Sequence, residues 1–170
     1  MQQTLKIRLA ALHDATAIAH VRRQAILSKA ATHYDQALLI AWADATNFPD
    51  RVRHFEQNIS DPGCVALVAE SGNDLCGFAI ADLVHCELQA LYSKPNPIGG
   101  IGRALLTALE KRAFATVPFL VCDASLNAER FYKVNGYLEE CRKDHVAPRS
   151  GVISRVVQMK KLRPANQEYA

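Results

Sequence analysis

The chain has 170 residues, 49% of them hydrophobic, and a formal net charge of +3. That length and apolar content are enough for one compact core, so a single domain over residues 1–162, with a polar tail over 163–170, is predicted. The net charge is mild and the sequence has no run of five or six residues of like charge, so bulk binding of nucleic acid is not expected. No stretch approaches a membrane span and no signal-peptide pattern is present, so a cytoplasmic protein with no membrane partner is expected.

Five cysteines are scattered among apolar neighbours, and no two of them form a C-x-x-C pair. This spacing disfavours zinc sites and redox pairs, so no metal is expected. Buried free thiols in a reducing compartment are the expected state. The cysteines lie at positions 64, 76, 86, 122 and 141.

The first third of the chain predicts one strand followed by three helices. Residues 3–9 alternate polar and apolar side chains, as a strand does. Apolar residues then recur at helical spacing from Asp14 to about residue 30, and Asp35 can cap a second helix. A third helix is predicted from about residue 49 to 59.

The pattern then changes from helices to strands. Residues 65–70 form an apolar run that is typical of a buried strand, and residues 71–74 have the composition of a hairpin turn. The partner strand is predicted over residues 75–83. A further strand is predicted over residues 84–93.

A glycine-rich segment follows, with Gly99, Gly100 and Gly102 leading into a helical pattern that extends to about residue 115. A glycine loop that opens a helix offers unpaired backbone N–H groups and the positive end of the helix dipole to an anion. Glycine also lets a phosphate approach the backbone closely. The segment is therefore a candidate anion cradle, and a plain turn between strand and helix is the alternative.

The last third of the chain predicts a strand over residues 118–123 and then a short helix. Ser125, Leu126 and Asn127 are expected to cap that helix, and Gly136 is its natural stop. Two strands, over residues 137–143 and 151–160, complete the chain. The order of elements predicts an α/β (α+β) fold, with one mixed sheet and helices packed on it.

Two blocks of the sequence resemble the GNAT superfamily of acyl-CoA N-acyltransferases. The glycine loop is similar to the family's pyrophosphate motif Q/R-x-x-G-x-G/A, and residues 125–137 (SLNAERFYKVNGY) resemble its N-x-x-A-x-x-F/L-Y-x-x-x-G-F/Y block. The resemblance implies a mostly antiparallel central sheet with helices on both faces. It also implies an N-acetyltransferase that uses acetyl-CoA as co-substrate and transfers the acetyl group to a small-molecule or protein amine by direct attack in a ternary complex.

The resemblance assigns the cofactor site to the loop, to the strand before it and to the second block. Pro97 and Gly99 depart from the motif, because members of the family usually have side chains at these positions that help to bind the pyrophosphate. Pro97 also has no N–H to donate. Backbone N–H groups are therefore expected to hold the pyrophosphate, and backbone groups of the preceding strand to pair with the pantetheine arm. The implied cofactor-binding residues are Leu91, Tyr92, Ser93, Ile98, Gly99, Gly100, Ile101, Gly102, Arg103, Ser125 and Asn127.

The same resemblance implies that Tyr132 is the general acid that protonates the departing sulfur. A phenol with a pKa near ~10 is neutral at pH 7 and can donate to a thiolate. The alternative is a core aromatic at helical spacing. Glu87 is the candidate general base, and Asp123 is the second choice. Two alternatives remain: Glu87 faces outward into solvent, or the protein has no dedicated base.

The acceptor pocket is expected between the first two helices and at the C-terminal hairpin. Its candidate residues are His33, Tyr34, Trp42 and His145. The acceptor amine is not identified, and a homodimer through the C-terminal strands is a further expectation. A nucleophilic role for Cys86 or Cys122 is less favoured than packing.

Two other readings of the sequence stay open. One is a non-catalytic acyl-CoA-binding or sensing module on the same fold, which the departures at Pro97 and Gly99 favour and which Tyr132 disfavours. The other is a nucleotide site at the glycine loop. It is disfavoured because neither G-K-[ST] nor G-x-G-x-x-G is present.

Overall fold

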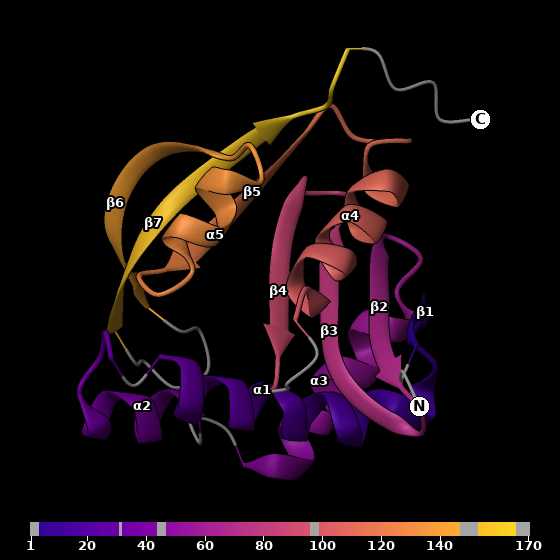
Figure 1. The fold of residues 1–170 in the computed structure, drawn as a ribbon, viewed down its shortest axis with the longest axis vertical. Helices are drawn as coiled ribbons and strands as arrows, with labels where there is room; N and C mark the ends of the chain where they lie inside the picture. Colours follow the sequence, from indigo (N-terminus) through magenta and orange to yellow (C-terminus); the bar gives the residue numbers. More distant parts are fainter. Residues whose placement is uncertain (1–3, 31, 44–46, 96–98, 147–152, 166–170) are drawn as a thin grey trace.

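The computed structural model describes residues 4–30, 32–43, 47–95, 99–146 and 153–165, and these form one sheet covered by helices (Figure 1). The strands are β1 (Leu5–Leu9), β2 (Cys64–Ser71), β3 (Asp74–Asp82), β4 (Glu87–Ser93), β5 (Phe119–Ser125), β6 (Leu138–Val146) and β7 (Ile153–Leu162). The helices are α1 (Ala15–Lys29), α2 (Gln36–Ala43), α3 (Phe48–Ser60), α4 (Ile101–Ala113) and α5 (Glu129–Val134). The predicted order of elements is confirmed.

The sheet has seven strands in the order β1-β2-β3-β4-β5-β7-β6. Every neighbouring pair is antiparallel except β4 and β5, which run parallel. The expectation of a mixed, mostly antiparallel sheet is therefore confirmed. The single parallel pair lies in the middle of the sheet, and the connection between its two strands carries α4.

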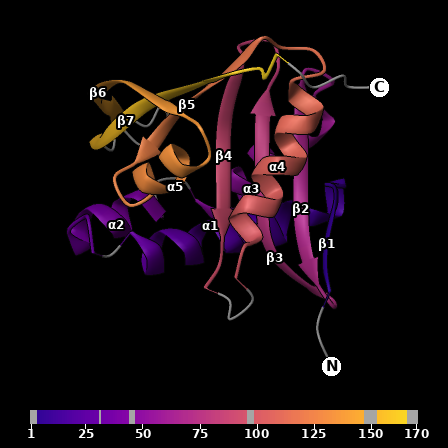
Figure 2. The ribbon, with the colours of Figure 1, turned by 45° about the horizontal axis from the view of Figure 1, so that its top comes forward.

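Helices cover both faces of the sheet, as Figures 1 and 2 show together. Leu105 and Leu109 of α4 pack in the same core as Ala79 of β3. Ile18 of α1 and Phe55 of α3 pack with Phe78 in a second core. Because successive strand residues point to opposite faces, β3 presents a small side chain to α4 and a large one to α1 and α3.

The sheet divides between β4 and β5. Among the described residues, Glu87 and Val121 form the one register pair between these two strands. From that point β5, β7 and β6 swing away from β4 (Figure 1). A β-bulge leaves Gln89 without an opposite residue, because Ala90 pairs with Ile80 and Leu88 pairs with Ala81. A bulge bends its strand and increases the local twist, which contributes to the divergence.

Gly77 on β3 lets α4 approach the sheet closely. A Cβ atom at this position would lie 2.9 Å from Ile101 Cγ2 and 2.9 Å from Leu105 Cδ1. The first two turns of α4 therefore sit directly on the glycine. Close packing there fixes where the N-terminus of α4 lies relative to β4.

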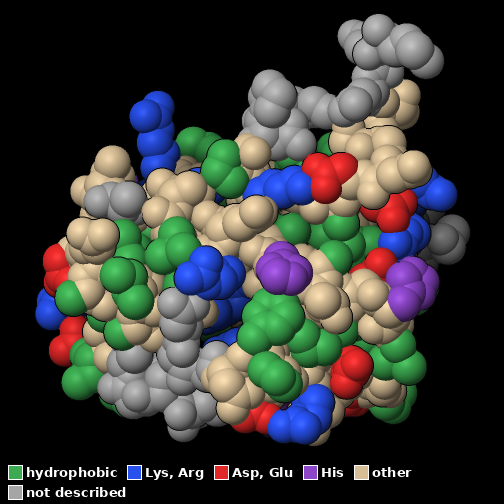
Figure 3. All heavy atoms as spheres, turned by 90° about the horizontal axis from the view of Figure 1, so that it is seen from below, with side chains coloured by type: hydrophobic (Ala, Val, Ile, Leu, Met, Phe, Trp, Pro, Cys, Tyr) green, Lys and Arg blue, Asp and Glu red, His purple; other side chains and the backbone are tan. Residues whose placement is uncertain are grey.

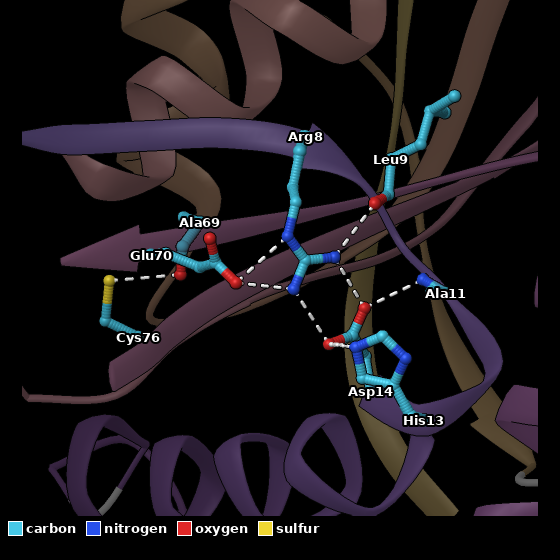
Figure 4. Close-up of polar contacts among 8 residues, drawn as sticks. All are labelled: Arg8, Leu9, Ala11, His13, Asp14, Ala69, Glu70 and Cys76. Atoms are coloured by element: carbon cyan, nitrogen blue, oxygen red, sulfur yellow. Dashed lines mark hydrogen bonds and ion pairs between the residues drawn. The ribbon is translucent and has the colours of Figure 1, made fainter. Parts of the chain in front are cut away.

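An ion-pair cluster joins β1, β2 and the turn that leads into α1 (Figure 4). Arg8 donates to both Asp14 oxygens, at 2.7 and 2.9 Å, and its Nε donates to Glu70 at 2.9 Å. The Ala11 N–H also donates to Asp14 at 2.7 Å. Hydrogen bonding to Arg8 lowers the pKa of Asp14 and of Glu70 below their ordinary values. The cluster fixes the start of α1 against the edge of the sheet.

Among the predicted boundaries, two that lie near the site were wrong. The strand predicted over residues 84–93 begins only at Glu87, because the Asp82 side chain accepts the N–H groups of Val84 at 2.9 Å and His85 at 3.0 Å and forms a turn. The last short helix begins at Glu129 and has no side-chain cap, so residues 125–127 do not cap it. Its predicted stop is confirmed, because Gly136 has a φ of +88°. No helix of the described residues is long and apolar enough to cross a membrane.

Candidate active site

The glycine loop forms a concave surface at the N-terminus of α4. Gly100 occupies the N-cap with a φ of +84°, and no side chain caps the helix. Among the described residues, no side chain therefore accepts from the first N–H groups of α4. Gly102 faces α5, where a Cβ atom would lie 3.5 Å from the Phe131 ring. A cavity of about 450 Å³ lies here, lined by Gly99, Gly100, Ile101, Gly102 and Arg103 among others.

Lys29, the last residue of α1, lines the same cavity. Its ammonium donates to Ser93 Oγ at 2.7 Å, and desolvation lowers the pKa of this lysine. Sequence reasoning missed this residue, because a lysine in the last turn of a helix is ordinarily explained by the helix dipole. Ile98 and Pro97, which the sequence also placed at this site, lie outside the described residues.

A second cavity, of about 210 Å³, continues from the first along the gap between β4 and β5. The two share Lys29, Ser93, Gly102 and Phe131. Asn127 lines the second cavity, and its Oδ1 is buried with no hydrogen-bond partner among the described residues. A buried acceptor without a donor is costly, so this oxygen is suited to a ligand N–H. Leu91, Tyr92 and Ser125, all implied by the resemblance, line the same cavity.

The third cavity has a volume of about 400 Å³ and contains the candidate chemistry. It shares Trp42, Leu91, Tyr92, Ser125 and Ala128 with the second cavity. The three cavities therefore adjoin in one groove. Tyr132, Glu87, Asp123 and His145 all line this third cavity, although they come from four different elements.

Tyr132 is 6% exposed and sits between two other rings. Its ring makes edge contacts with Phe131 and Tyr137, each at a centroid distance of 5.2 Å. Burial raises the pKa of Tyr132 well above its ordinary value of 10. No described residue hydrogen-bonds its hydroxyl. The phenol is therefore a neutral proton donor on the wall of the cavity.

The acidic groups of the cavity differ in their partners. Asp123 on β5 lies 3.2 Å from His145 Nδ1 and 3.0 Å from Lys143 Nζ, both on β6. Glu87 at the start of β4 is half-buried and has no ion-pair partner among the described residues. With Nδ1 of His145 directed at a carboxylate, Nε2 is the nitrogen left to accept a proton.

Cys122 lines the cavity but is poorly suited to attack. It is 2% exposed, and burial raises the pKa of its thiol well above the ordinary value. A thiol in such surroundings stays protonated, and the thiolate is the reactive form. The sequence-based preference for a packing role is consistent with this placement.

The predicted acceptor residues separate into two pairs. Trp42 and His145 line the cavity. Tyr34 instead links segments of the backbone: its hydroxyl donates to the Arg155 carbonyl at 2.8 Å and accepts the Leu126 N–H at 2.9 Å. His33 is exposed and its Nδ1 lies 2.8 Å from the neighbouring Thr32 hydroxyl. Neither Tyr34 nor His33 belongs to the cavity walls described above.

Sequence reasoning missed several polar residues of the cavity wall, four of which come from α1 and α3. They are Arg22, Arg51, His54 and Asn58. Figure 3 views the face that carries these helices, where Lys and Arg side chains lie beside a histidine around a hollow near the centre. Within the part of the chain that the structure describes, no group of three or more His, Cys, Asp or Glu side chains is placed to hold a metal ion.

Comparison with known proteins gives a consistent result. Residues 27–137 match the model of the acetyltransferase (GNAT) family. A GCN5-related N-acetyltransferase (aminotransferase, class-II) from Rhodopseudomonas palustris has 26% identity and a TM-score of 0.81, with 95% of this chain and 98% of that chain covered. None of the curated protein sequences gives a significant match.

Two further solved structures share the fold at 21% identity. PaiA N-acetyltransferase from Thermoplasma acidophilum, in complex with coenzyme A, has a TM-score of 0.74, with 94% of this chain and 99% of that chain covered. YncA from Salmonella typhimurium, with its cofactor acetyl-CoA, has a TM-score of 0.67, with 98% of each chain covered.

Proposed function

Because the chain belongs to the acetyltransferase (GNAT) family, we propose that it transfers the acetyl group of acetyl-CoA to an amine by direct attack in a ternary complex. The observation that carries the proposal is the groove formed by the three adjoining cavities. It begins at the N-terminus of α4, passes through the gap between β4 and β5, and ends beside Tyr132. A diphosphate, a flexible amide-containing arm and a thioester would occupy it in that order.

The residues at the α4 end fit an anionic group. Gly100, Ile101, Gly102 and Arg103 line the first cavity at the start of α4, where the first N–H groups of a helix and its dipole favour an anion. Lys29 supplies a cation from α1 that compensates for the absence of a basic side chain at Gly99. In the adjoining cavity, Asn127 Oδ1 is free to accept an amide N–H of the pantetheine arm. The backbone of Leu91 and Ser93 would pair with the arm as an added strand.

The reaction requires a neutral amine, a polarised carbonyl and a proton for the departing sulfur. The amine nitrogen attacks the thioester carbon, the C–S bond breaks, and the Tyr132 hydroxyl gives its proton to the sulfur. The raised pKa of Tyr132 keeps that proton in place at neutral pH. Attack by Cys122 is disfavoured because burial also raises the pKa of its thiol.

Two groups are candidates to take the proton from the amine. Glu87 lines the cavity without an ion-pair partner among the described residues, so its carboxylate is available to a bound amine or to a water. His145 is the second candidate, since its contact with Asp123 orients the ring and leaves Nε2 to accept a proton. We propose Glu87 as the base. A Glu87→Gln variant should then lose more of its kcat than a His145→Gln variant does.

The proposal is tested by following release of the CoA thiol from acetyl-CoA in the presence of a panel of amines. At least one amine should support turnover, and Tyr132→Phe should lower kcat by about 10²–10⁴-fold, the range for loss of a general acid. The dissociation constant for CoA should change by less than about twofold, because the phenol acts only on the departing sulfur.

Tyr137→Phe is the matched control for this experiment. It also removes a buried hydroxyl from an aromatic ring in contact with Tyr132, but Tyr137 is not part of the cavity walls described above. Its kcat should stay near that of the unaltered protein. Tight CoA binding without turnover of any amine would contradict the transferase proposal and favour a non-catalytic acyl-CoA-sensing module.

We further propose that residues 1–162 act as one acetyltransferase domain in the cytoplasm, without a nucleic-acid partner, and that a homodimer forms through the C-terminal strands. Light scattering during size-exclusion chromatography measures the oligomeric state directly.

A further inference from the structure

Arg22 is a buried cation that has no counter-ion within the described part of the chain. It lies on the inner face of α1, and the residue is 9% exposed. A guanidinium has five N–H donors. Here one of them, Nη2, donates to the Trp42 carbonyl at a long 3.4 Å, and the group lies 5.9 Å from the centre of the Tyr92 ring. None of the described carboxylates forms an ion pair with it.

Arg8, a partly buried arginine near the start of α1, does have counter-ions. Arg8 is clamped between Asp14 and Glu70, and these carboxylates accept most of its donors (Figure 4). Leaving a buried charge unpaired is strongly unfavourable, so buried arginines are normally matched in this way. Among the described residues, Arg22 therefore lacks a counter-ion of the kind that Arg8 has.

The place of Arg22 indicates where that counter-ion comes from. Arg22 lines the cavity that also contains Tyr132 and Glu87. It does not line the cavity at the α4 end, which Lys29 reaches. The two cations are seven residues apart on α1, which corresponds to about 10 Å along a helix. Lys29 thus serves the phosphate end of the groove, and Arg22 serves the reaction end.

Apart from His145 on β6, the basic and the acidic side chains that line the reaction cavity come from different walls. Arg22 comes from α1, and Arg51 and His54 come from α3. The acidic side chains, Glu87 and Asp123, come instead from the two strands at the split in the sheet. A ligand with a cationic or neutral amine at one end and an anion at the other complements this division.

We propose that Arg22 binds an anionic group on the acceptor, so that the substrate is an amine that carries a carboxylate on the same molecule. This inference rests on the proposed transferase function and specifies its substrate class. A guanidinium binds a carboxylate through two parallel N–H···O bonds, which would both neutralise Arg22 and orient the amine toward the thioester. Arg22 is then a residue that determines acceptor specificity.

The test compares acceptors in matched pairs, namely free L-amino acids and their carboxamides, with thiol release from acetyl-CoA as the readout. The carboxylate member should have the higher kcat/KM, by about 10–100-fold, which is the size of a charge-assisted hydrogen-bond pair. Arg22→Gln should abolish this preference by lowering kcat/KM for the carboxylate member only. Arg22→Lys should restore part of it, because the charge is kept and the paired geometry is lost.

Arg53→Gln is the matched control, because Arg53 lies on α3, is mostly exposed and pairs with Asp50 outside the cavity. It should leave the preference unchanged. CoA affinity and the melting temperature establish that the Arg22 variants are folded. If they do not fold, the preference of the unaltered enzyme between carboxylate and carboxamide decides the matter by itself.

The possible outcomes distinguish failure of the Arg22 inference from failure of the proposed transferase function. Turnover of carboxamides or simple amines with no preference for a carboxylate would overturn this inference and leave the transferase function standing. An equal loss for every acceptor in Arg22→Gln would also overturn it, since it would indicate a role toward the thioester. CoA binding without turnover of any acceptor would overturn the proposed function, and this inference with it.

Discussion

Replacing Lys29 with methionine tests whether α1 supplies a cation to the phosphates of CoA. The substitution removes the ammonium and keeps most of the stem. A hydrogen bond to a charged group is worth about 1.5–3 kcal/mol, but Lys29 is largely exposed and screened, so about 1 kcal/mol is the appropriate magnitude. That corresponds to an increase of about fivefold in the dissociation constant of CoA.

Isothermal titration with CoA at low ionic strength measures the change. Lys111→Met is the matched control, because this lysine is exposed in the last turn of α4, away from the glycine loop. Pantetheine, which lacks the phosphates, should bind the Lys29→Met and unaltered proteins equally well. Raising the salt to about 1 M, where the screening length falls to about 3 Å, should bring the two CoA dissociation constants together.

Two results would refute the reasoning about Lys29. One is an unchanged affinity for CoA at low salt. The other is an equal loss of affinity for CoA and pantetheine that persists at high salt, because this would indicate a packing role for the stem beside Ser93 rather than a role for the charge.

Three further predictions concern the loop, the acid and the fold. Gly100→Pro should abolish CoA binding, because proline fixes φ near about −65° whereas Gly100 has a φ of +84°. Arg103→Ala should weaken CoA binding only about two- to fivefold. Equal losses of affinity for the two variants in titrations would contradict the proposal that backbone N–H groups hold the diphosphate. Because burial raises the pKa of Tyr132, its hydroxyl should stay protonated from pH 6 to 10. Loss of the Tyr132 proton should therefore not lower kcat at alkaline pH, and any alkaline decrease in kcat should also be present in Tyr132→Phe. Arg8 holds the pKa of Asp14 below 3.8, so its stabilisation is present at neutral pH and is lost on acidification. Asp14→Asn should thus lower Tm by roughly 6 °C at pH 7, for a loss of about 2 kcal/mol, and thermal melts should show that difference narrowing as the pH falls below about 4. A difference that stays constant on acidification would argue against the ion pair.

The order of elements could be predicted from the sequence because it depends on local periodicity. The switch from helical spacing to alternation near Cys64 and the glycines before α4 are both visible in the residues themselves. The turn before β4 could not be predicted this way. The apolar residues near Val84 suggest a strand, but the Asp82 side chain captures the neighbouring N–H groups and starts a turn.

The reaction cavity was predictable only in part, because tertiary contacts assemble it. Tyr132 and Glu87 could be named from a motif and a strand. The contact between Asp123 and His145 spans the intervening strand β7, and it depends on the register of β5, β7 and β6. Arg22 and Lys29 resemble ordinary solvated helix residues in the sequence, and only the packing of α1 against β4 brings them to the groove.

A crystal structure of the protein with CoA is the most direct test of the central claim. The account predicts that the diphosphate lies within hydrogen-bond distance of the N–H groups of Gly100–Arg103, that the pantetheine arm passes Asn127 between β4 and β5, and that the sulfur lies beside the Tyr132 hydroxyl. Binding of CoA at any other surface, or a sulfur remote from Tyr132, would contradict it.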